Sequence, residues 1–307
     1  MQLLAELLMV GTVAGVKVGI AALGFALIFF TTREMHFAFG ALCVFGAYVC
    51  FWVVTAFAES TFGVFLGIVA ALTATAAVSV ALHRFLYLKL RSVMPVLMAS
   101  LGTGIVLENV LQIIATPDVS IVRFPSITQI ISIGGLRIRA LDLGVLVLFA
   151  VIAVALDLFL NRTRVGQGLS ATIEDPEMAE LVGIRTSLMR VGAYAAGACL
   201  GAASGVIMLF DTGVKPANGF IILLYALIVT IVSRGNLRAV AAWSVLFGVA
   251  RSLWSWQFAT DYTDLAVFAI MVTYLMVRDY SARYQKISVK PARSKLSSSV
   301  APAKQGG

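Results

Sequence analysis

Charged side chains are scarce in this chain, since Asp, Glu, Lys and Arg make up only 12% of its 307 residues. A soluble domain carries about 25%. Hydrophobic residues make up 60% of the chain, and they come in blocks of about 20, the length that crosses a bilayer. The composition argues against a soluble protein and predicts an all-α, polytopic transmembrane helical bundle.

Cysteine and histidine are equally rare, with three cysteines and two histidines. Cys43, Cys50 and Cys199 lie in apolar segments, and the first two are roughly 10 Å apart along one helix, too far for a disulfide. We therefore expect no disulfide, no metal ion and no cofactor. The 23 basic residues exceed the 15 acidic ones, but they follow the membrane pattern, so we expect no nucleic-acid partner.

The apolar blocks predict eight or nine spans. They are expected near 8–31, 38–57, 62–82, 94–115, 141–161, 190–210, 219–233, 238–258 and 262–278. The seventh is short and is interpreted as a full span or a broken, re-entrant segment. The polar link 31–37 is either a loop or part of a bent helix.

Lysine and arginine distribute unevenly over alternate loops, with 17 of the 23 on one side and four on the other. Cytoplasmic loops carry the excess of Lys and Arg. The count predicts that the N-terminus lies outside and the C-terminus in the cytoplasm, as in a multi-pass protein of the bacterial inner membrane.

Two segments outside the spans have a composition of their own. The basic, Ser- and Pro-rich tail 285–307 lacks apolar residues for a core and is predicted to be disordered, which leaves 1–284 as the membrane domain. The external loop 116–140 holds prolines and a Gly134-Gly135 pair between Ile-rich stretches. We expect an ordered loop there, with a small hairpin.

A short acidic stretch, SATIEDPEMAELVGI over 170–184, falls in the largest predicted cytoplasmic loop, about 162–190. Asp175 suits an N-cap, Pro176 the first helical position and Gly183 the C-terminal stop. The resulting helix is too short to persist alone in water. It either packs on its own membrane domain, through the apolar face of Met178, Leu181 and Val182, or docks on a cytoplasmic partner.

The run 162–184, RTRVGQGLSATIEDPEMAELVGI, resembles the cytoplasmic coupling loop of permeases of the branched-chain amino acid ABC transporter type. The small-residue run 192–205, the pattern Gly213-x-x-Pro216-x-x-Gly219, the stretch His36-Phe-Ala-Phe-Gly40 and Gly46-Ala-Tyr48 are similar to further family motifs in order and spacing. The resemblance extends over roughly residues 10–280. Gly192, Gly197, Gly201 and Gly205 are also spaced for close helix packing.

In such transporters the loop helix inserts into a groove on a cytoplasmic ATPase. The resemblance therefore implies cytoplasmic ABC ATPase subunits, a second, related permease in a heterodimer, a periplasmic solute-binding protein and surrounding membrane lipid as partners. The chain has no G-x-x-x-x-G-K-[ST] phosphate-binding loop, so any ATP hydrolysis belongs to a separate subunit. The residues expected to contact the ATPase are Glu174, Asp175, Glu177, Met178, Glu180, Leu181 and Gly183.

The chain departs from the family in its polar motifs. His36 and Phe39 stand where the family commonly has Asn and His, and Ala41 replaces an acidic residue. A later glycine-rich signature is reduced essentially to Gly235. These segments would line or support the pathway, so their loss leaves the substrate open.

Charged residues within spans mark candidate pathway positions, because a charge at membrane depth costs at least about 2.5 kcal/mol. Lys17, Glu108 and Arg251 are predicted at similar depths, with Asn109 and Gln112 extending the polar face of Glu108. Two interpretations stay open. The three charges pair with one another in an internal salt bridge that joins the spans, or the positive charge in excess meets the carboxylate of a substrate. The expected pathway residues are His36, Phe39, Gly40, Lys17, Glu108 and Arg251.

Together these features predict a permease subunit of an ATP-binding-cassette importer. By resemblance it would carry branched-chain or other small amino acids, or related solutes such as amides or urea, by alternating access. The alternative is a secondary transporter driven by an ion gradient. An intramembrane enzyme is disfavoured, because the sequence shows no nucleophile–base pair and no metal-ligand set.

Overall fold

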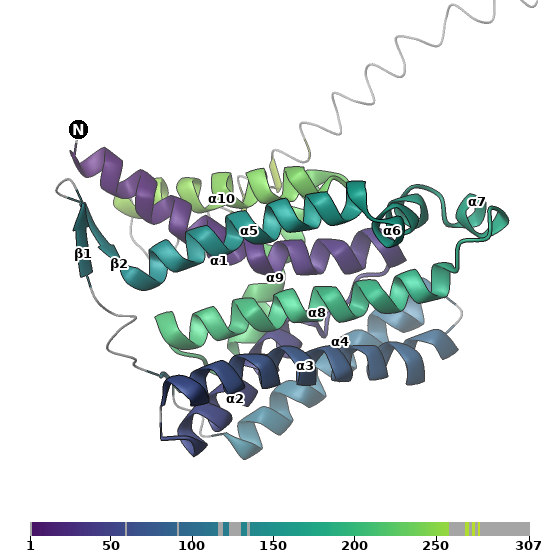
Figure 1. Ribbon diagram of the computed structural model, residues 1–307, viewed down its shortest axis with the longest axis horizontal. Helices are drawn as coiled ribbons and strands as arrows, with labels where there is room; N and C mark the ends of the chain where they lie inside the picture. The colour runs from purple at the N-terminus through teal and green to yellow at the C-terminus, as the bar shows by residue number, and fades with distance from the viewer. Residues whose placement is uncertain are drawn as a thin grey trace, which may run out of the picture.

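Long antiparallel helices dominate the computed structural model (Figure 1). It describes residues 2–58, 60–90, 92–115, 119–122, 130–133 and 136–257, together with 268, 269, 272, 273 and 276. The long helices are α1 (Gln2–Thr32), α2 (Phe39–Ala56), α3 (Thr61–Phe85), α4 (Val93–Ile114), α5 (Ala140–Arg162), α8 (Thr186–Asp211), α9 (Asn218–Ser233) and α10 (Leu237–Gln257). Shorter elements are the 3-10 turn η1 (Tyr87–Lys89), α6 (Arg164–Glu174), α7 (Pro176–Leu181), β1 (Ile130–Ile133) and β2 (Leu136–Arg139).

The bounds of the first eight predicted spans agree closely with these helices, but the eighth, 238–258, forms α10, which is not among the helices apolar enough to cross a membrane. Within the described residues, six helices are long and apolar enough to cross a membrane, and they correspond to the first six predicted spans. The seventh, α9, is a shorter apolar helix of 16 residues, as its sequence suggested. The predicted span 262–278 falls mostly outside the described residues, and the tail 285–307 entirely so.

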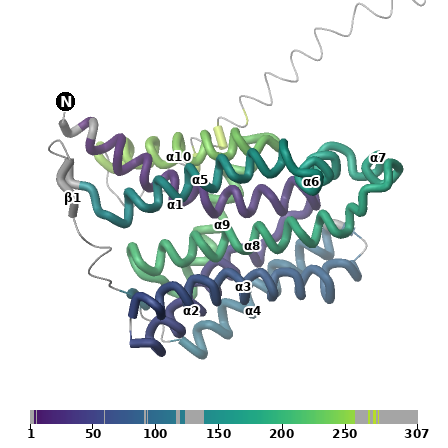
Figure 2. Tube along the Cα trace, in the orientation of Figure 1, coloured from purple at the N-terminus to yellow at the C-terminus, as the bar shows by residue number. Residues whose placement is uncertain are grey.

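Two landmarks define the ends of the bundle. The antiparallel hairpin of β1 and β2 caps one end, which confirms the hairpin predicted within 116–140. Helix α7 projects from the opposite end (Figures 1 and 2). We refer to these as the hairpin end and the α7 end.

The helices form two similar units that run in opposite directions. In the first, α1 runs from the hairpin end and is joined to α2 by the link 33–38; in the second, α8 runs from the α7 end and is joined to α9 by the link 212–217. Each link has six residues. Helix α1 packs on α9 and α10, and α8 packs correspondingly on α2 and α3. Inverted units of this kind are a common plan of membrane transporters.

Helices α1 and α8 meet at the centre through glycine. A Cβ atom on Gly24 would lie 2.6 Å from the carbonyl oxygen of Gly197, and a Cβ on Gly197 would lie 2.6 Å from that of Gly24. Gly201 and Gly205 pack against α2 in the same way, which confirms three of the four predicted packing glycines. The prediction was wrong for Gly192, which has open space beside it and lines an apolar cleft instead.

Candidate functional site

Helix α7 forms as the local sequence predicts. The Asp175 side chain accepts hydrogen bonds from the backbone N–H groups of Glu177 and Met178, both at 3.1 Å. Pro176 occupies the first turn. Gly183 has φ +88°, a left-handed conformation that favours glycine. These capping contacts hold a helix of six residues that would be too short to persist alone.

The apolar face of α7 points away from the protein. Leu181 is 81% exposed, Val182 77% and Met178 59%, whereas Ala179 on the opposite side is buried. The membrane domain of this chain therefore does not cover that face. Of the two interpretations left open by the sequence, packing on the chain's own membrane domain is wrong for these three side chains.

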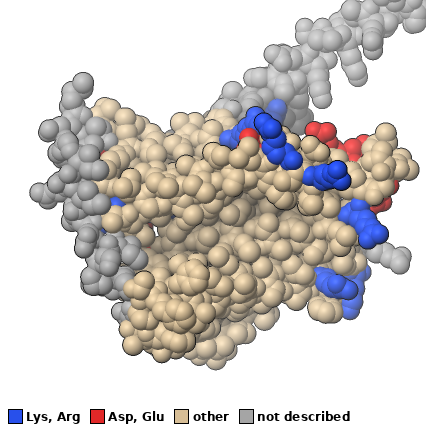
Figure 3. Space-filling view, in the orientation of Figure 1, with Lys and Arg blue, Asp and Glu red and all other residues tan. Residues whose placement is uncertain are grey.

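The seven residues predicted to contact an ATPase divide into two groups. Glu174, Glu177, Met178 and Leu181 are exposed on or beside α7. Asp175, Glu180 and Gly183 also shape the helix itself, because Asp175 caps it, Glu180 accepts a hydrogen bond from the Thr186 hydroxyl, and Gly183 turns the chain. Figure 3 shows acidic side chains gathered at α7 with lysines and arginines around them at the same end of the visible face.

The link 33–38 leads into a buried cluster of aromatic rings. His36 packs edge-on against Tyr87 and Tyr194, with ring centroids 5.3 Å apart in both pairs, and His83 stacks on Tyr194 at 4.3 Å. Both ring nitrogens of His36 and of His83 are buried and have no hydrogen-bond partner among the described residues. Burial, and after it the charge of His83, lowers the pKa of His36 to about 3, so the ring is neutral at pH 7.

Glu34 lies at the edge of this cluster. Its carboxylate accepts a hydrogen bond from the Tyr194 hydroxyl at 3.5 Å. Burial raises the pKa of Glu34, and the charge of Arg190 acts in the opposite direction. A carboxylate, two imidazoles and two phenols thus lie together at the link 33–38, and the Arg190 guanidinium is near enough to act on Glu34. The sequence singled out His36, but not the residues of α3 and α8 that pack around it.

Phe39 and Gly40 form the first turn of α2, which abuts the first turn of α9. A Cβ on Gly40 would lie 2.0 Å from the carbonyl oxygen of Gly219, so the two backbones touch. The motifs His36-Phe-Ala-Phe-Gly40 and Lys215-Pro-Ala-Asn-Gly219 occupy corresponding places in the two units. The N-terminal ends of two helices therefore meet inside the bundle.

Lys17 does not pair with Glu108 or stand beside Arg251, so the grouping of these three residues was wrong. Its ammonium contacts Asp142 of α5 at 2.8 Å and Asp211 of α8 at 2.9 Å. Arg139 completes the cluster, at 2.9 Å from Asp142 and 2.6 Å from Asp211. The partners come from the hairpin-end termini of α5 and α8, and the cluster locks three helices together.

The remaining two span charges lie apart. The Arg251 guanidinium stands over the Tyr225 ring, 5.4 Å from its centroid. Glu108 lies on α4, where Gln112 reaches it at 3.5 Å, and it lines a small cavity beside the Gly40–Gly219 junction. Of the six predicted pathway residues, the structure brings Gly40 and Glu108 to one region and leaves Lys17 and Arg251 outside it.

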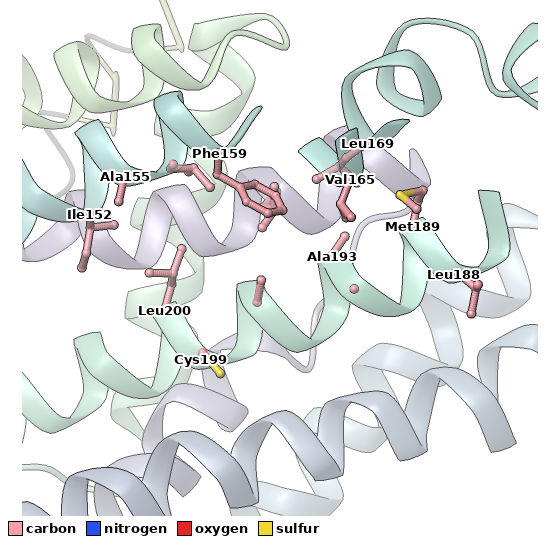
Figure 4. Close-up of a pocket in the computed structure, with 14 residues that line it drawn as sticks. Ile152, Ala155, Phe159, Val165, Leu169, Leu188, Met189, Ala193, Cys199 and Leu200 are labelled. Carbon is pink, nitrogen blue, oxygen red and sulfur yellow. The ribbon is translucent and has the colours of Figure 1, made fainter. Parts of the chain in front are cut away.

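A larger cleft of about 550 Å³ opens between α5 and α8 beside α6 (Figure 4). Phe159 and Ile152 reach into it from α5, Val165 and Leu169 from α6, and Leu200 from α8. All the described residues that line it are apolar, among them the sulfur-containing Met189 and Cys199. Such a wall provides no group to hold a charged solute, but it leaves space between α8 and the segment that carries α7.

The sequence matches a family described as "Branched-chain amino acid transport system / permease component" over residues 7–275. Similar proteins include the high-affinity branched-chain amino acid transport system permease protein LivH of Salmonella typhimurium and of Escherichia coli K12. Each is 24% identical over 282 residues, which cover 87% of this chain and 91% of LivH. The corresponding permease BraD of Pseudomonas aeruginosa is 23% identical over 284 residues, with 87% and 92% coverage.

Proposed function

The chain belongs to the family of branched-chain amino acid transport permeases, and we propose that it forms the path for branched-chain or other small amino acids. It is a permease subunit of an ATP-binding-cassette importer, a multi-pass inner-membrane protein and not an enzyme. The three relatives are named for branched-chain amino acids, which supports that substrate class. Amides, urea and related small solutes are the wider class to be tested beside it.

The exposed apolar face of α7 is the observation that carries the mechanism. Three neighbouring apolar side chains, Met178, Leu181 and Val182, project into solvent with acidic residues around them. An apolar patch rimmed by polar residues is typical of a protein–protein contact. We assign this face to a groove of a cytoplasmic ABC ATPase, which would move α6 and α8 as nucleotide is bound and hydrolysed.

The remaining subunits follow from the same mechanism. A second, related permease would cover the other side of the path, two ATPases would dock at the α7 end, and a periplasmic solute-binding protein would deliver solute at the hairpin end. The lysines and arginines at the α7 end support this orientation, because cytoplasmic ends of spans carry the excess of basic residues. Alternating access follows if solute binds differently to the two states of the path.

Co-purification tests the docking of α7. Tagged wild-type chain is expected to retain the ATPase subunit, and Leu181→Asp to lower the retained amount by about tenfold, the effect of losing a central apolar contact. Asn236→Asp adds the same charge in an exposed turn at the same end and is the matched control. Equal retention by both variants would contradict the assignment.

Transport measurements separate the importer from its rival. Proteoliposomes holding the assembled subunits are expected to accumulate solute only with ATP on the ATPase side, and to continue when ionophores collapse ion gradients. A secondary transporter driven by an ion gradient would show the reverse pattern.

A further inference from the structure

A cavity of about 60 Å³ lies where α2, α4 and α9 meet. Gly104, Ile105 and Glu108 of α4 form one wall, Ala41 of α2 another, and Gly219 and Phe220 of α9 the third. A water molecule takes about 30 Å³ in the liquid, so the cavity holds a group of about two water molecules. It fits the polar head group of a small solute rather than a whole amino acid.

Glu108 gives the cavity a negative wall at membrane depth. It lies about 9 Å from the last residue of α4, at 1.5 Å per residue. Within the described residues it has no cation within 4.0 Å, and the Lys17 ammonium is paired elsewhere, with Asp142 and Asp211. A carboxylate in a span is costly unless it meets water or an opposite charge. Glu108 is therefore placed to receive a cation.

The expected cation is organic rather than a metal ion. Within the described part of the chain, no group of three or more His, Cys, Asp or Glu side chains stands close enough together to hold a metal. Glu108 is a single carboxylate, and its Oε1 already accepts a hydrogen bond from the Gln112 amide at 3.5 Å, which leaves few acceptor positions. That is suited to an ammonium group, which needs only a few hydrogen-bond acceptors.

The opposite wall is favourable for a negative group. The first turns of α2 and α9 meet at Gly40 and Gly219, and both helices begin without a side-chain cap, since Ala38 and Ala217 occupy the N-cap positions. Helix N-termini carry partial positive charge, and broken helices in transporters direct it at anionic solute groups. The cavity thus has a negative and a positive side.

We infer that this cavity binds the head group of an α-amino acid, with its ammonium group at Glu108 and its carboxylate toward the first turns of α2 and α9. The aliphatic side chain extends over Leu101, Ile105 and Phe220, which are 44%, 54% and 55% exposed. This inference rests on the proposed function, because it names the groups of the same path that recognise its solute.

The test uses the complete importer in proteoliposomes with L-leucine and acetamide as probes. Glu108→Gln keeps the shape of the side chain and removes the charge, and it is expected to lower L-leucine transport at least tenfold, the effect of losing one charged hydrogen bond. Glu108→Asp keeps the charge and is expected to retain most of the transport. Glu6→Gln, which removes an exposed carboxylate of α1, is the matched control.

Three outcomes would overturn the inference. Unchanged L-leucine transport by Glu108→Gln would show that the carboxylate does not hold the solute. Loss of the second permease from the purified Glu108→Gln complex would make Glu108 an interface residue. Wild-type transport of acetamide with none of L-leucine would contradict the inference and the proposed substrate class together, whereas the first two outcomes leave that class intact.

Discussion

Arg33 and Ile173 join two parts of the chain that are 140 residues apart. The Arg33 guanidinium, directly after the last turn of α1, donates a hydrogen bond of 2.7 Å to the backbone carbonyl of Ile173 in α6. Ile173 lies three residues before α7 begins. Arg33 also opens the link 33–38, which carries Glu34 and His36. A movement of α7 therefore has a direct route to the link at the start of α2.

Arg33→Ala is expected to weaken coupling more than assembly. Without the guanidinium, α6 loses its hydrogen bond to the link, so motion of α7 reaches α2 less directly. We expect ATP hydrolysis by the assembled importer to remain within about twofold of wild type and transport per ATP to fall about tenfold, the scale of one charged hydrogen bond. Simultaneous measurement of ATPase activity and solute uptake checks this.

Arg84→Ala is the control for that prediction, because Arg84 is an exposed basic residue of α3 near the same end. It is expected to leave transport per ATP unchanged. If Arg33→Ala lowers ATPase activity and uptake in equal proportion, the hydrogen bond serves folding or assembly and not coupling.

Local sequence signals predicted the elements whose contacts are local. The cap at Asp175, the turn at Gly183 and the hairpin ahead of α5 each depend on neighbouring residues, and each was confirmed. The partners of Lys17 were missed because Asp142 and Asp211 lie 125 and 194 residues away and only the packing of α1, α5 and α8 brings them together. The cavity at Glu108 likewise depends on the junction of α2 with α9, which no spacing in the sequence reveals.

Gly40→Ala is expected to disrupt the junction of α2 and α9. The added Cβ would lie 2.0 Å from the Gly219 carbonyl oxygen, a backbone atom with no rotamer to change. Overpacking of this kind costs about 1–3 kcal/mol or more. Gly102→Ala, on an exposed part of α4 with nothing within 4 Å of the new Cβ, is the matched control and is expected to be neutral or slightly stabilising.

Thermal unfolding of the two glycine variants in detergent measures the difference. The apparent Tm of Gly40→Ala is expected to fall below that of Gly102→Ala, with solute uptake lost in parallel. Equal melting temperatures would mean that α2 and α9 separate without cost, and the junction would not be a fixed contact.

His36 is expected to make stability depend on pH. Burial lowers the pKa of the folded-state ring to about 3, whereas an unfolded chain takes up the proton near pH 6.5. Above pH 6.5 the ring is neutral in both states, and below it only the unfolded state gains the proton, so stability falls as the pH drops toward 3.

The variant His36→Phe keeps a ring against Tyr87 and Tyr194 and removes the titration. Between pH 7 and pH 5 it is expected to lose about 2 kcal/mol less stability than wild type, from about 1.4 kcal/mol for each pH unit below 6.5. Unfolding in detergent at the two pH values measures this difference. Parallel losses in wild type and variant would show that other groups dominate the acid response.

Lys17 is expected to hold helices together and not to bind solute. Its side chain is 19% exposed, and the side chains of its partners Asp142 and Asp211 are 13% and 11% exposed. Lys17→Met leaves those carboxylates with Arg139 alone and should destabilise the protein by about 2–3 kcal/mol, somewhat below the 3–5 kcal/mol of a fully buried pair. Lys215→Met, which removes an exposed lysine near the same end, is the control and should change stability little.

The double variant Lys17→Met with Asp211→Asn decides between the two roles. It removes one charge of each sign, so much of the lost stability should return, and the importer should again transport solute at close to the wild-type rate. If Lys17 instead held the carboxylate of the solute, the double variant would fold and assemble but stay inactive. Unfolding in mixed micelles, measured beside uptake in proteoliposomes, separates these results, because stability and transport recover together only when the ion cluster is structural.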